Sequence, residues 1–497
     1  MKINYLKSSL LVFSVSLITN VSLAQTQQTK DSIDNFIAGK MQKLQIPGLQ
    51  LAVIRNGKLE KLKSYGLANI ENNVAATDES VFSINSCTKA FVGVAIMQLQ
   101  EQGKLNINDP ISKYIDNIPL SWQKITLKQL LTNTSGLPNI IDDTEHVLGG
   151  GREAAAWATV KALPIEFNPG DKFSYNQTGY VILGKIITKL SGMHFTEFIE
   201  ENQFKVVGMM QTRFGDSNDI IPHSAGGYSV VNSVNGQWAE GKDLRAIYME
   251  FPVFFRTASG ILSTAKELAE WIIALQSGKL LRNKASLTAL WSPAILNNGQ
   301  VGGFNNLVNG YALGWPTATR ADHPAVGPVG GMRSTFFVYP QDDLSIIVLT
   351  NLQGANPEYF TDEIAGYYIP DMHEANGFGL PHYVKQLRQE LLKSGFDNAF
   401  TISKNLKKKD PKFTLNENDL NGYGYRLLGE EKRKEALAIF KLNTELFPKS
   451  GNTYDSYAET LLLLGEKDAA LKNYKLSFKL DPKNTNAANQ IKNLERK

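Results

Sequence analysis

Ser86 and Lys89 form the pair of side chains in this sequence whose types and spacing best suit nucleophilic catalysis. A serine hydroxyl is a poor nucleophile until a neighbouring group accepts its proton. The residues after Lys89 have a helical pattern, and residues three apart lie on one face of a helix. If burial lowers the pKa of Lys89, its amine can take the proton of Ser86. On its own the pair is a weak signal, because a chain of 497 residues contains several such pairs by chance.

The other residues that could do chemistry offer few alternatives. Cys87 as a nucleophile would have Lys89 at i+2, pointing elsewhere, so we expect Cys87 to be a small buried residue. It is the one cysteine of the chain, so no internal disulfide is expected. The six histidines are scattered, and none is paired at the spacing of metal ligands. We therefore expect no metal and no cofactor.

Two predicted hairpins lie at opposite ends of the region that must position this pair. In the first, residues 49–54 and residues 58–65 flank an Asn-Gly dipeptide, which is a strong signal for a two-residue turn. The second joins residues 334–339 to residues 344–350. The pattern between the hairpins is mostly helical. We therefore predict an α+β domain with one antiparallel sheet formed by the two ends of this region.

Two of the helices between the hairpins have clear boundaries. One is predicted over residues 90–102, and Gly103 stops it. Another opens at Thr264, with Glu267 three residues later in the pattern of a capping box, and it ends near Gly278.

The last 80 or so residues contain a repeat. Ala436 and Ala470 are 34 residues apart, and so are Pro448 and Pro482. The small alanine permits close helix packing, and proline ends the second helix of each pair. This part resembles a short tetratricopeptide array, with two recognisable repeats and a last helix from about Thr485. The resemblance implies an all-α array, which could bind a protein or peptide partner on its concave surface.

Three segments downstream of Ser86 and Lys89 give the pair its context. Residues 125–138 contain Leu-Leu-Thr-Asn-Thr-Ser-Gly-Leu, residues 169–180 contain Tyr175, and residues 258–264 begin with Ala-Ser-Gly. In order and spacing these segments resemble class C β-lactamases and the related serine β-lactamase and penicillin-binding-protein-like hydrolases. The resemblance covers about residues 30–370. It implies a β-lactamase/transpeptidase-like antiparallel sheet flanked by helices, with a helical subdomain.

The same resemblance implies that Tyr175 is the third catalytic group. Lys89 would stabilise the phenolate form of Tyr175, which could then relay protons between Ser86, the leaving group and the deacylating water. Gln177 stands where relatives have the asparagine of a Tyr-x-Asn motif, and it could offer its amide to an acyl carbonyl. Asn133 replaces a histidine at a position that we expect to be structural.

The third motif of these enzymes, Lys-Thr-Gly or His-x-Gly, is degenerate in this chain. Aligned without a gap from the second hairpin, its cation position falls on Ala325 and its oxyanion position on Pro328, which has no N–H. A register with a two-residue deletion instead lets Gly331, next to Gly330, donate the N–H. We prefer the second register because it keeps the donor.

In either register, the lysine or histidine that helps β-lactam and peptidoglycan enzymes bind a substrate carboxylate is missing. Its absence favours an uncharged ester or amide over a penicillin as the substrate. Arg333 or His323 could supply the cation instead.

The N-terminus has the pattern of a signal peptide. Lys2 and Lys7 form a positive region, an apolar stretch over residues 10–18 follows, and cleavage would fall between Ala24 and Gln25. We therefore expect an exported, periplasmic protein. The net charge is +4, and no concentrated basic face indicates a nucleic-acid partner. No later apolar stretch approaches the length of a membrane span.

We divide the chain into four predicted parts, namely a signal peptide (1–24), a hydrolase domain (25–375), a helical linker or degenerate repeat (376–415) and repeats (416–497). The expected function is hydrolysis of an ester or amide in a small-molecule or peptide-like substrate through an acyl-serine. A carboxylesterase is the first candidate, a D-aminoacyl peptidase the second and a β-lactamase the third. The alternative from another class is a catalytically decayed hydrolase that binds a partner through the repeats.

Overall fold

The computed structural model describes residues 32–142, 146–234, 237–373 and 376–495. The predicted signal peptide over residues 1–24 lies outside the described residues. The chain forms two compact units, Met1–Ile369 and Pro370–Lys497, which are described separately below.

The first unit is built on one large sheet whose centre joins the two ends of the unit. Both predicted hairpins are present, and their strands β1 and β14 pair antiparallel, with Leu51 opposite Val348. The predicted α+β architecture is therefore confirmed. From one edge to the other the strands are β3 (Val74–Ala75), β2 (Lys58–Asn69), β1 (Gly48–Arg55), β14 (Leu344–Thr350), β13 (Ser334–Tyr339), β11 (Ala325–Val326), β10 (Pro316–Ala318) and β9 (Gly310–Tyr311), and β12 (Val329–Gly330) also pairs with β13.

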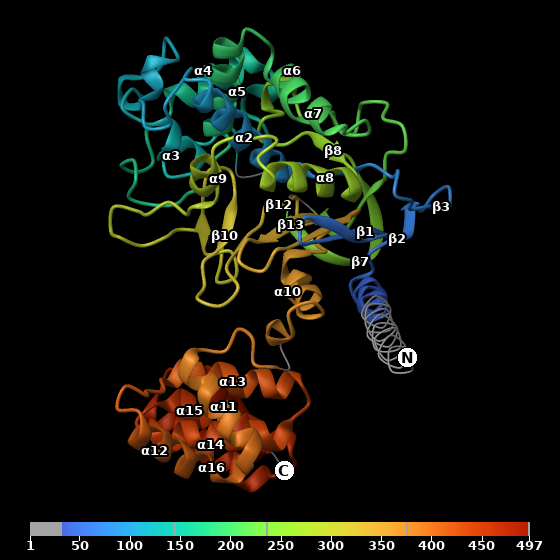
Figure 1. Ribbon diagram of the computed structural model, residues 1–497. Helices are drawn as coiled ribbons and strands as arrows, with labels where there is room; N and C mark the ends of the chain where they lie inside the picture. Colours follow the sequence, from blue (N-terminus) through green and yellow to red (C-terminus); the bar gives the residue numbers. More distant parts are fainter. Residues whose placement is uncertain (1–31, 143–145, 235–236, 374–375, 496–497) are drawn as a thin grey trace, which may run out of the picture. The chain divides into compact units, whose positions relative to one another are not determined.

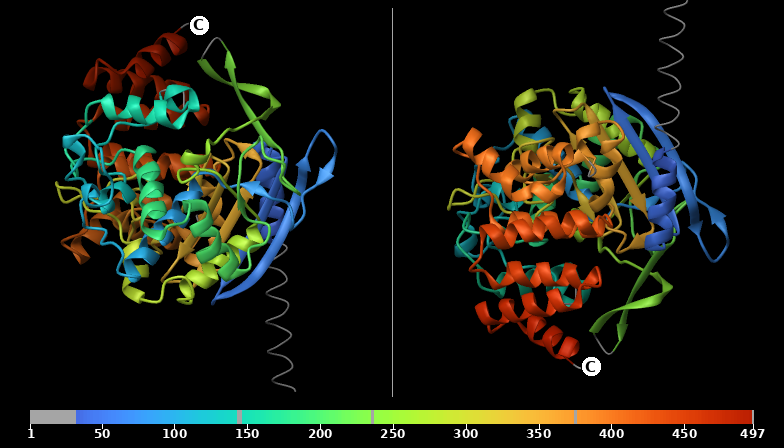
Figure 2. Two further views of the ribbon diagram at one scale, coloured as in Figure 1. Left: turned by 90° about the horizontal axis from the view of Figure 1, so that it is seen from above. Right: turned by 90° about the horizontal axis from the view of Figure 1, so that it is seen from below.

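Two smaller sheets flank the large one. The first brings β4 next to the nucleophile segment, and the second contains a long hairpin that projects from the body of the unit (Figure 2). Their strands are β4 (Phe82–Ser83), β8 (Ile261–Ser263) and β5 (Arg213–Phe214) in one, and β15 (Leu352–Gln353), β6 (Gly227–Val234) and β7 (Gln237–Ile247) in the other.

Helices cover both faces of the large sheet, with α8 on one face and α10 on the other (Figure 1). The remaining helices form the helical subdomain and its connections. Their bounds are α2 (Thr88–Glu101), α3 (Leu127–Leu131), α4 (Glu153–Ala162), α5 (Thr178–Ser191), α6 (Phe195–Ile199), α7 (Lys205–Val207), α8 (Ala265–Gln276), α9 (Lys284–Trp291) and α10 (Glu358–Gly366).

The core lies between α2, α8 and the sheet. The rings of Trp271 and Trp315 stack with an interplanar angle of 6° and centroids 5.9 Å apart. Phe91 of α2 stacks on the other side of Trp271, and Phe336 of β13 meets Trp315 edge to face. Helix α2 is buried from Thr88 to Leu99, so it is a central helix and not a surface helix with one apolar face.

The predicted start of α8 is correct, but its capping box is only half formed. The hydroxyl of Thr264 accepts the backbone N–H of Glu267, as predicted. The carboxylate of Glu267, however, accepts the backbone N–H groups of Gln211 and Thr212 at 2.8 Å and does not turn back to the cap. The strand β5 is thereby tied to α8.

The second unit consists of helices with a constant spacing. Helices α13 (Glu417–Gly429) and α15 (Gly451–Leu463) begin 34 residues apart, and so do α14 (Arg433–Leu446) and α16 (Lys467–Leu480). Helix α12 (Ala399–Lys409) begins 34 residues before α14. The predicted packing positions Ala436 and Ala470 are both fully buried. The remaining helices are α11 (His382–Ser394) and α17 (Thr485–Glu495).

The helices α11 and α12 belong to the same core as the helices that follow them. Val384, Leu387 and Leu391 of α11 pack in one cluster with Leu420 of α13 and Phe440 of α14. The compact unit thus begins near Pro370, a few residues before the predicted domain boundary at residue 375. Among the described residues, no helix is long and apolar enough to cross a membrane.

Because the core of the first unit contains only residues up to Leu349, a chain ending at Ile369 is expected to fold on its own. A chain ending at Leu415 should be less soluble, because it would expose the apolar face of α11 that α13 and α14 normally cover. Thermal melting followed by circular dichroism, together with binding of a hydrophobic dye, measures both effects. The division is incorrect if the longer chain folds and the shorter one does not.

Candidate active site

Ser86 lies in a tight turn that presents its side chain alone. It is the middle residue of a short 3-10 helix, η1 (Asn85–Cys87), which leads directly into α2. Asn85 has a φ of +47°, and its side-chain oxygen accepts a hydrogen bond from the hydroxyl of Ser83. Asn85 and Cys87 are buried, whereas Ser86 is partly exposed. The turn therefore offers one hydroxyl to an incoming substrate, and the prediction that Cys87 is a buried residue is confirmed.

Lys89 lies one helical turn further on, within reach of Ser86. Its Nζ is 3.5 Å from Oγ of Ser86 and donates to the carbonyl oxygen of Ala258 at 2.7 Å. The side chain is only 1% exposed. This burial lowers the pKa of Lys89 well below its usual range, because the ammonium form loses its hydration. An uncharged amine at this place can accept the proton of Ser86.

The segment from Ala258 to Ile261 holds the nucleophile turn from both ends. Ile84, just before the turn, donates its N–H to the carbonyl of Ile261 at 3.0 Å. The N–H of Ile261 is donated to the hydroxyl of Thr88, just after the turn, at 3.1 Å. Gly260 supplies a φ of +127°, which a residue with a side chain rarely adopts. The conformation of this segment thus fixes both the turn and the carbonyl that binds Lys89.

Tyr175 reaches the same place from a loop before α5. Its phenol is hydrogen-bonded to the side chains of Ser86 and Gln177. Nζ of Lys89 lies 4.7 Å from the centre of the Tyr175 ring. Ser86, Lys89 and Tyr175, which the sequence predicts as a triad, are therefore brought together.

The ionisation of Tyr175 differs from the expectation that Lys89 would stabilise a phenolate. Burial raises the pKa of Tyr175 well above its usual value, and the neighbouring phenol of Tyr311 adds to the rise. The physical reason is that the same burial that affects Tyr175 also removes the charge from Lys89. In the resting site the amine is the base and the phenol keeps its proton.

Asn133 positions the loop that carries Tyr175. It is buried, with a φ of +55°. Its backbone carbonyl accepts the N–H of Ser174 at 2.9 Å, and its side-chain oxygen accepts the N–H of Asn176 at 3.0 Å. The residues on either side of Tyr175 are thus both fixed by Asn133. The prediction of a structural role for this residue is confirmed.

Gln177 caps the start of α5 next to the triad. It is 8% exposed, and its side-chain oxygen has no hydrogen-bond partner among the described residues. Its amide is hydrogen-bonded to the phenol of Tyr175. The residue is therefore placed beside the catalytic groups, as the sequence comparison of motifs implied.

Gly330 and Gly331 lie against the nucleophile turn. A Cβ on Gly330 would collide with the carbonyl oxygen of Ile84, and a Cβ on Gly331 would collide with the side-chain amide of Asn85. Gly331 also has a φ of +55°. Two glycines are therefore required for the strand to approach η1 this closely. The two-residue deletion of the third motif is the register that brings a glycine N–H to this place.

Ala325 and His323 lie further along the sheet. Strand β11 meets β13 at Val338, four residues of strand from Ser334, which corresponds to about 13 Å. The ring of His323 is hydrogen-bonded to Asp342 in the turn after β13, at 2.8 Å. The suggestion that His323 supplies the missing cation is therefore wrong, because it is fixed at the opposite end of the strand.

An aromatic wall beside Tyr175 was not predicted from the sequence. Phe304 is 40% exposed, and its ring centre lies 4.9 Å from that of Tyr175. Phe173 and Tyr311 complete the wall behind them, with ring centres 5.5 Å apart. These aromatic residues belong to no recognisable motif, so only the fold brings them together. No group of three histidine, cysteine, aspartate or glutamate side chains among the described residues could hold a metal ion.

Comparison with known proteins gives a relative with similar length of match. "Protein flp" of Staphylococcus aureus strain MRSA252 is 29% identical over 343 residues, which cover 67% of this chain and 64% of that protein. The chain thus matches less than two thirds of the length of this relative.

Solved structures share the fold of the first unit. The octameric penicillin-binding protein homologue from Pyrococcus abyssi has a TM-score of 0.59 and 24% identity, covering 72% of this chain and 81% of that chain. A class C β-lactamase in complex with cefoxitin has a TM-score of 0.56 and 20% identity, covering 70% of this chain and 99% of that chain.

A family model described as "Beta-lactamase" matches residues 33–367, well over half of the chain. This range contains the nucleophile turn, the buried lysine and the tyrosine loop described above. The chain therefore belongs to the β-lactamase family of serine hydrolases.

Proposed function

We propose that the first unit hydrolyses carboxylic esters, with D-aminoacyl amides as a second class of substrate. The observation that carries this proposal is the uncharged, buried amine of Lys89 at 3.5 Å from Oγ of Ser86. The wall formed by Phe304 and Tyr175 favours an apolar group next to the scissile bond. The missing lysine or histidine of the third motif makes a penicillin the third candidate.

In the proposed reaction, Oγ of Ser86 attacks the carbonyl carbon while its proton passes to Nζ of Lys89. The N–H groups of Ser86 and Gly331 hold the oxyanion of the tetrahedral intermediate. The phenol of Tyr175 then donates its proton to the leaving oxygen or nitrogen, and the acyl-serine remains.

The ammonium that forms on Lys89 is stabilised without a carboxylate. Its Nζ lies 4.7 Å from the ring of Tyr175 and 5.0 Å from the ring of Tyr180, distances at which a cation is attracted to an aromatic face. Transfer of this proton to the phenolate of Tyr175 restores both groups. A water molecule then attacks the acyl ester, and the same two groups handle its proton.

For the second unit we propose a tetratricopeptide array. Its support is the common 34-residue spacing of the helices and the buried Ala436 and Ala470 at equivalent positions. The helices α11 and α12 fit the same spacing, which favours a degenerate first repeat over a linker. A protein or peptide partner of this array is part of the proposal.

The nucleophile can be tested by labelling with a fluorophosphonate probe and by turnover of p-nitrophenyl butyrate. We expect both signals to vanish in Ser86→Ala and to persist in Cys87→Ala, the matched change at the neighbouring residue. A folded protein that neither labels nor turns over any ester would instead support a decayed hydrolase that acts through its helical array.

The base can be tested by the pH dependence of kcat/KM. Only the neutral amine of Lys89 accepts a proton, so activity should rise with pH through the folded pKa of Lys89, well below 10.5. Lys89→Arg keeps the charge but cannot lose its proton, and activity should fall by about 10²–10⁴-fold. Tyr175→Phe should lower the rate while keeping the acidic limb. An acidic limb that survives in Lys89→Arg and disappears in Tyr175→Phe would assign the base to Tyr175.

We also propose that the protein is exported. Mass spectrometry of the protein recovered from a periplasmic fraction should show an N-terminus at Gln25, because the sequence Ser-Leu-Ala before it suits signal peptidase. Recovery of chains that start at Met1 would contradict this.

A further inference from the structure

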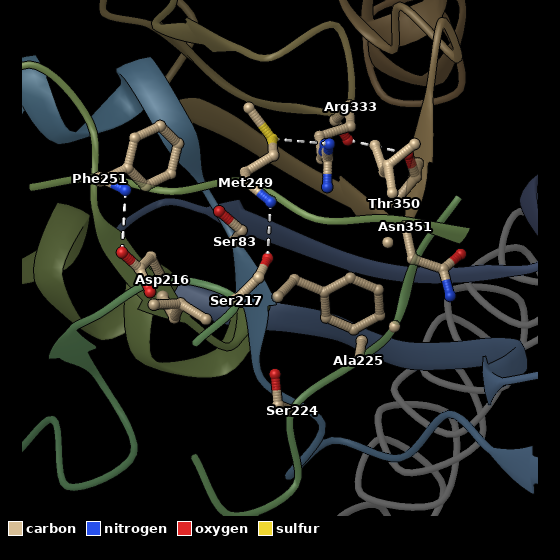
Figure 3. A pocket seen from close by; sticks show the side chains of 15 residues that line it. Ser83, Asp216, Ser217, Ser224, Ala225, Met249, Phe251, Arg333, Thr350 and Asn351 are labelled. Atoms are coloured by element: carbon tan, nitrogen blue, oxygen red, sulfur yellow. Dashed lines mark hydrogen bonds between the residues drawn. The ribbon is translucent and has the colours of Figure 1, made fainter. Parts of the chain in front are cut away.

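A small pocket lies next to the nucleophile turn, outside the triad. It has a volume of about 50 Å³ and is lined on one side by Phe82 and Ser83, which precede the turn. Met249 and Arg333 form another part of its wall, with Thr350 beside them (Figure 3). Its lining is mostly polar and comes from segments far apart in the sequence.

Arg333 brings an unpaired charge into this pocket. The residue is 4% exposed, and no described carboxylate lies within 4.0 Å of its guanidinium. Its Nε has no hydrogen-bond partner, and its Nη2 donates to Sδ of Met249 at 3.0 Å. Burial lowers the pKa of Arg333 to about 10. A buried guanidinium with only a weak sulfur acceptor is costly, which points to a partner that arrives from outside the chain.

The acidic residue in the same pocket does not supply that partner. The carboxylate of Asp216 accepts the N–H of Asn218 at 2.9 Å and the N–H of Phe251 at 2.8 Å. It also lies 3.6 Å from the guanidinium of Arg256. Its charge is therefore already compensated, and the positive charge of Arg333 is the one without a counterpart.

We propose that Arg333 anchors an anion-binding pocket that takes one carboxylate group. A planar guanidinium matches a carboxylate with two parallel hydrogen bonds, and Arg333 has donors free to make them. The volume of about 50 Å³ suits a single group of this size. The thioether of Met249 is flexible and can give way to a stronger acceptor. The hydroxyls of Ser83 and Ser217 lie in the same wall.

The pocket is coupled to the nucleophile by direct contacts. Sδ of Met249, which accepts from Arg333, lies 3.6 Å from Nδ2 of Asn85, the residue before Ser86. The chain from Ser83 to Ser86 spans at most about 10 Å. A carboxylate on Arg333 is thus close enough to belong to a bound substrate, and it can equally be a free small carboxylate that fixes the turn. Only the choice between these sources rests on the proposed function.

Binding is measured first without catalysis, by thermal melting of the full-length Ser86→Ala protein. Sodium formate should raise the Tm by about 3 °C relative to sodium chloride of equal ionic strength, and the rise should grow with formate concentration. Equal effects of formate and chloride would overturn the proposal, whether or not the wild-type protein hydrolyses esters.

Variants then assign the effect to Arg333. In the Ser86→Ala protein, Arg333→Met should abolish the formate effect and raise the Tm in chloride, because it removes an unpaired buried charge. Arg245→Met removes the same charge from an exposed position on β7 and should leave the formate effect unchanged. A formate effect that persists in Arg333→Met would overturn the proposal. Should Arg333→Met not fold, Arg333→Lys, which lacks the planar fork, should weaken the formate effect.

The source of the carboxylate follows from kinetics with two matched esters, mono-p-nitrophenyl succinate and p-nitrophenyl butyrate. If the substrate supplies the carboxylate, Arg333→Met should lower kcat/KM for the succinate ester about tenfold more than for the butyrate ester. Formate should then inhibit only the succinate ester. If a free carboxylate occupies the pocket, formate should change the rates of both esters by the same factor.

Discussion

The removal of Lys89 from water is the constraint on which the rest of the first unit depends. A lysine amine is useful as a base only when it is uncharged, and burial within α2 and the surrounding core achieves this. A fully buried amine still needs a hydrogen-bond acceptor, which the carbonyl of Ala258 provides at 2.7 Å. That carbonyl belongs to the segment whose other backbone groups hold the nucleophile turn from both ends. Chemistry and packing are therefore satisfied by the same few atoms.

Three separate parts of the chain converge on this centre, each with its own device for precision. The helix α2 supplies Ser86 and Lys89, the loop fixed by Asn133 supplies Tyr175, and the glycines before β13 close the site from the sheet. Each device is a local backbone solution, such as a positive φ or a residue without a side chain. Such conformations are tolerated because the surrounding core determines them.

The sequence was sufficient for the elements and residues that leave a local signal. Both hairpins, the pairing of β1 with β14, the start of α8 and the triad all follow from turn residues, capping residues and motif spacing. Three features could not be read locally. The protonated state of Tyr175 depends on how much water the folded site excludes, the wall around Phe304 depends on which loops meet, and the isolation of His323 depends on strand register. The unpaired charge of Arg333 is likewise visible only once its neighbours are known.

The pairing of β1 with β14 also governs the order in which the protein can fold. Some 290 residues separate these neighbouring strands, as in the contact of Leu51 with Val348. During synthesis the first strand must wait until the last has left the ribosome, so the sheet that carries the nucleophile closes late. The helices of the second unit touch mainly their neighbours in sequence and form as quickly as they are made. The part of the chain made last can therefore complete its structure while the part made first is still closing.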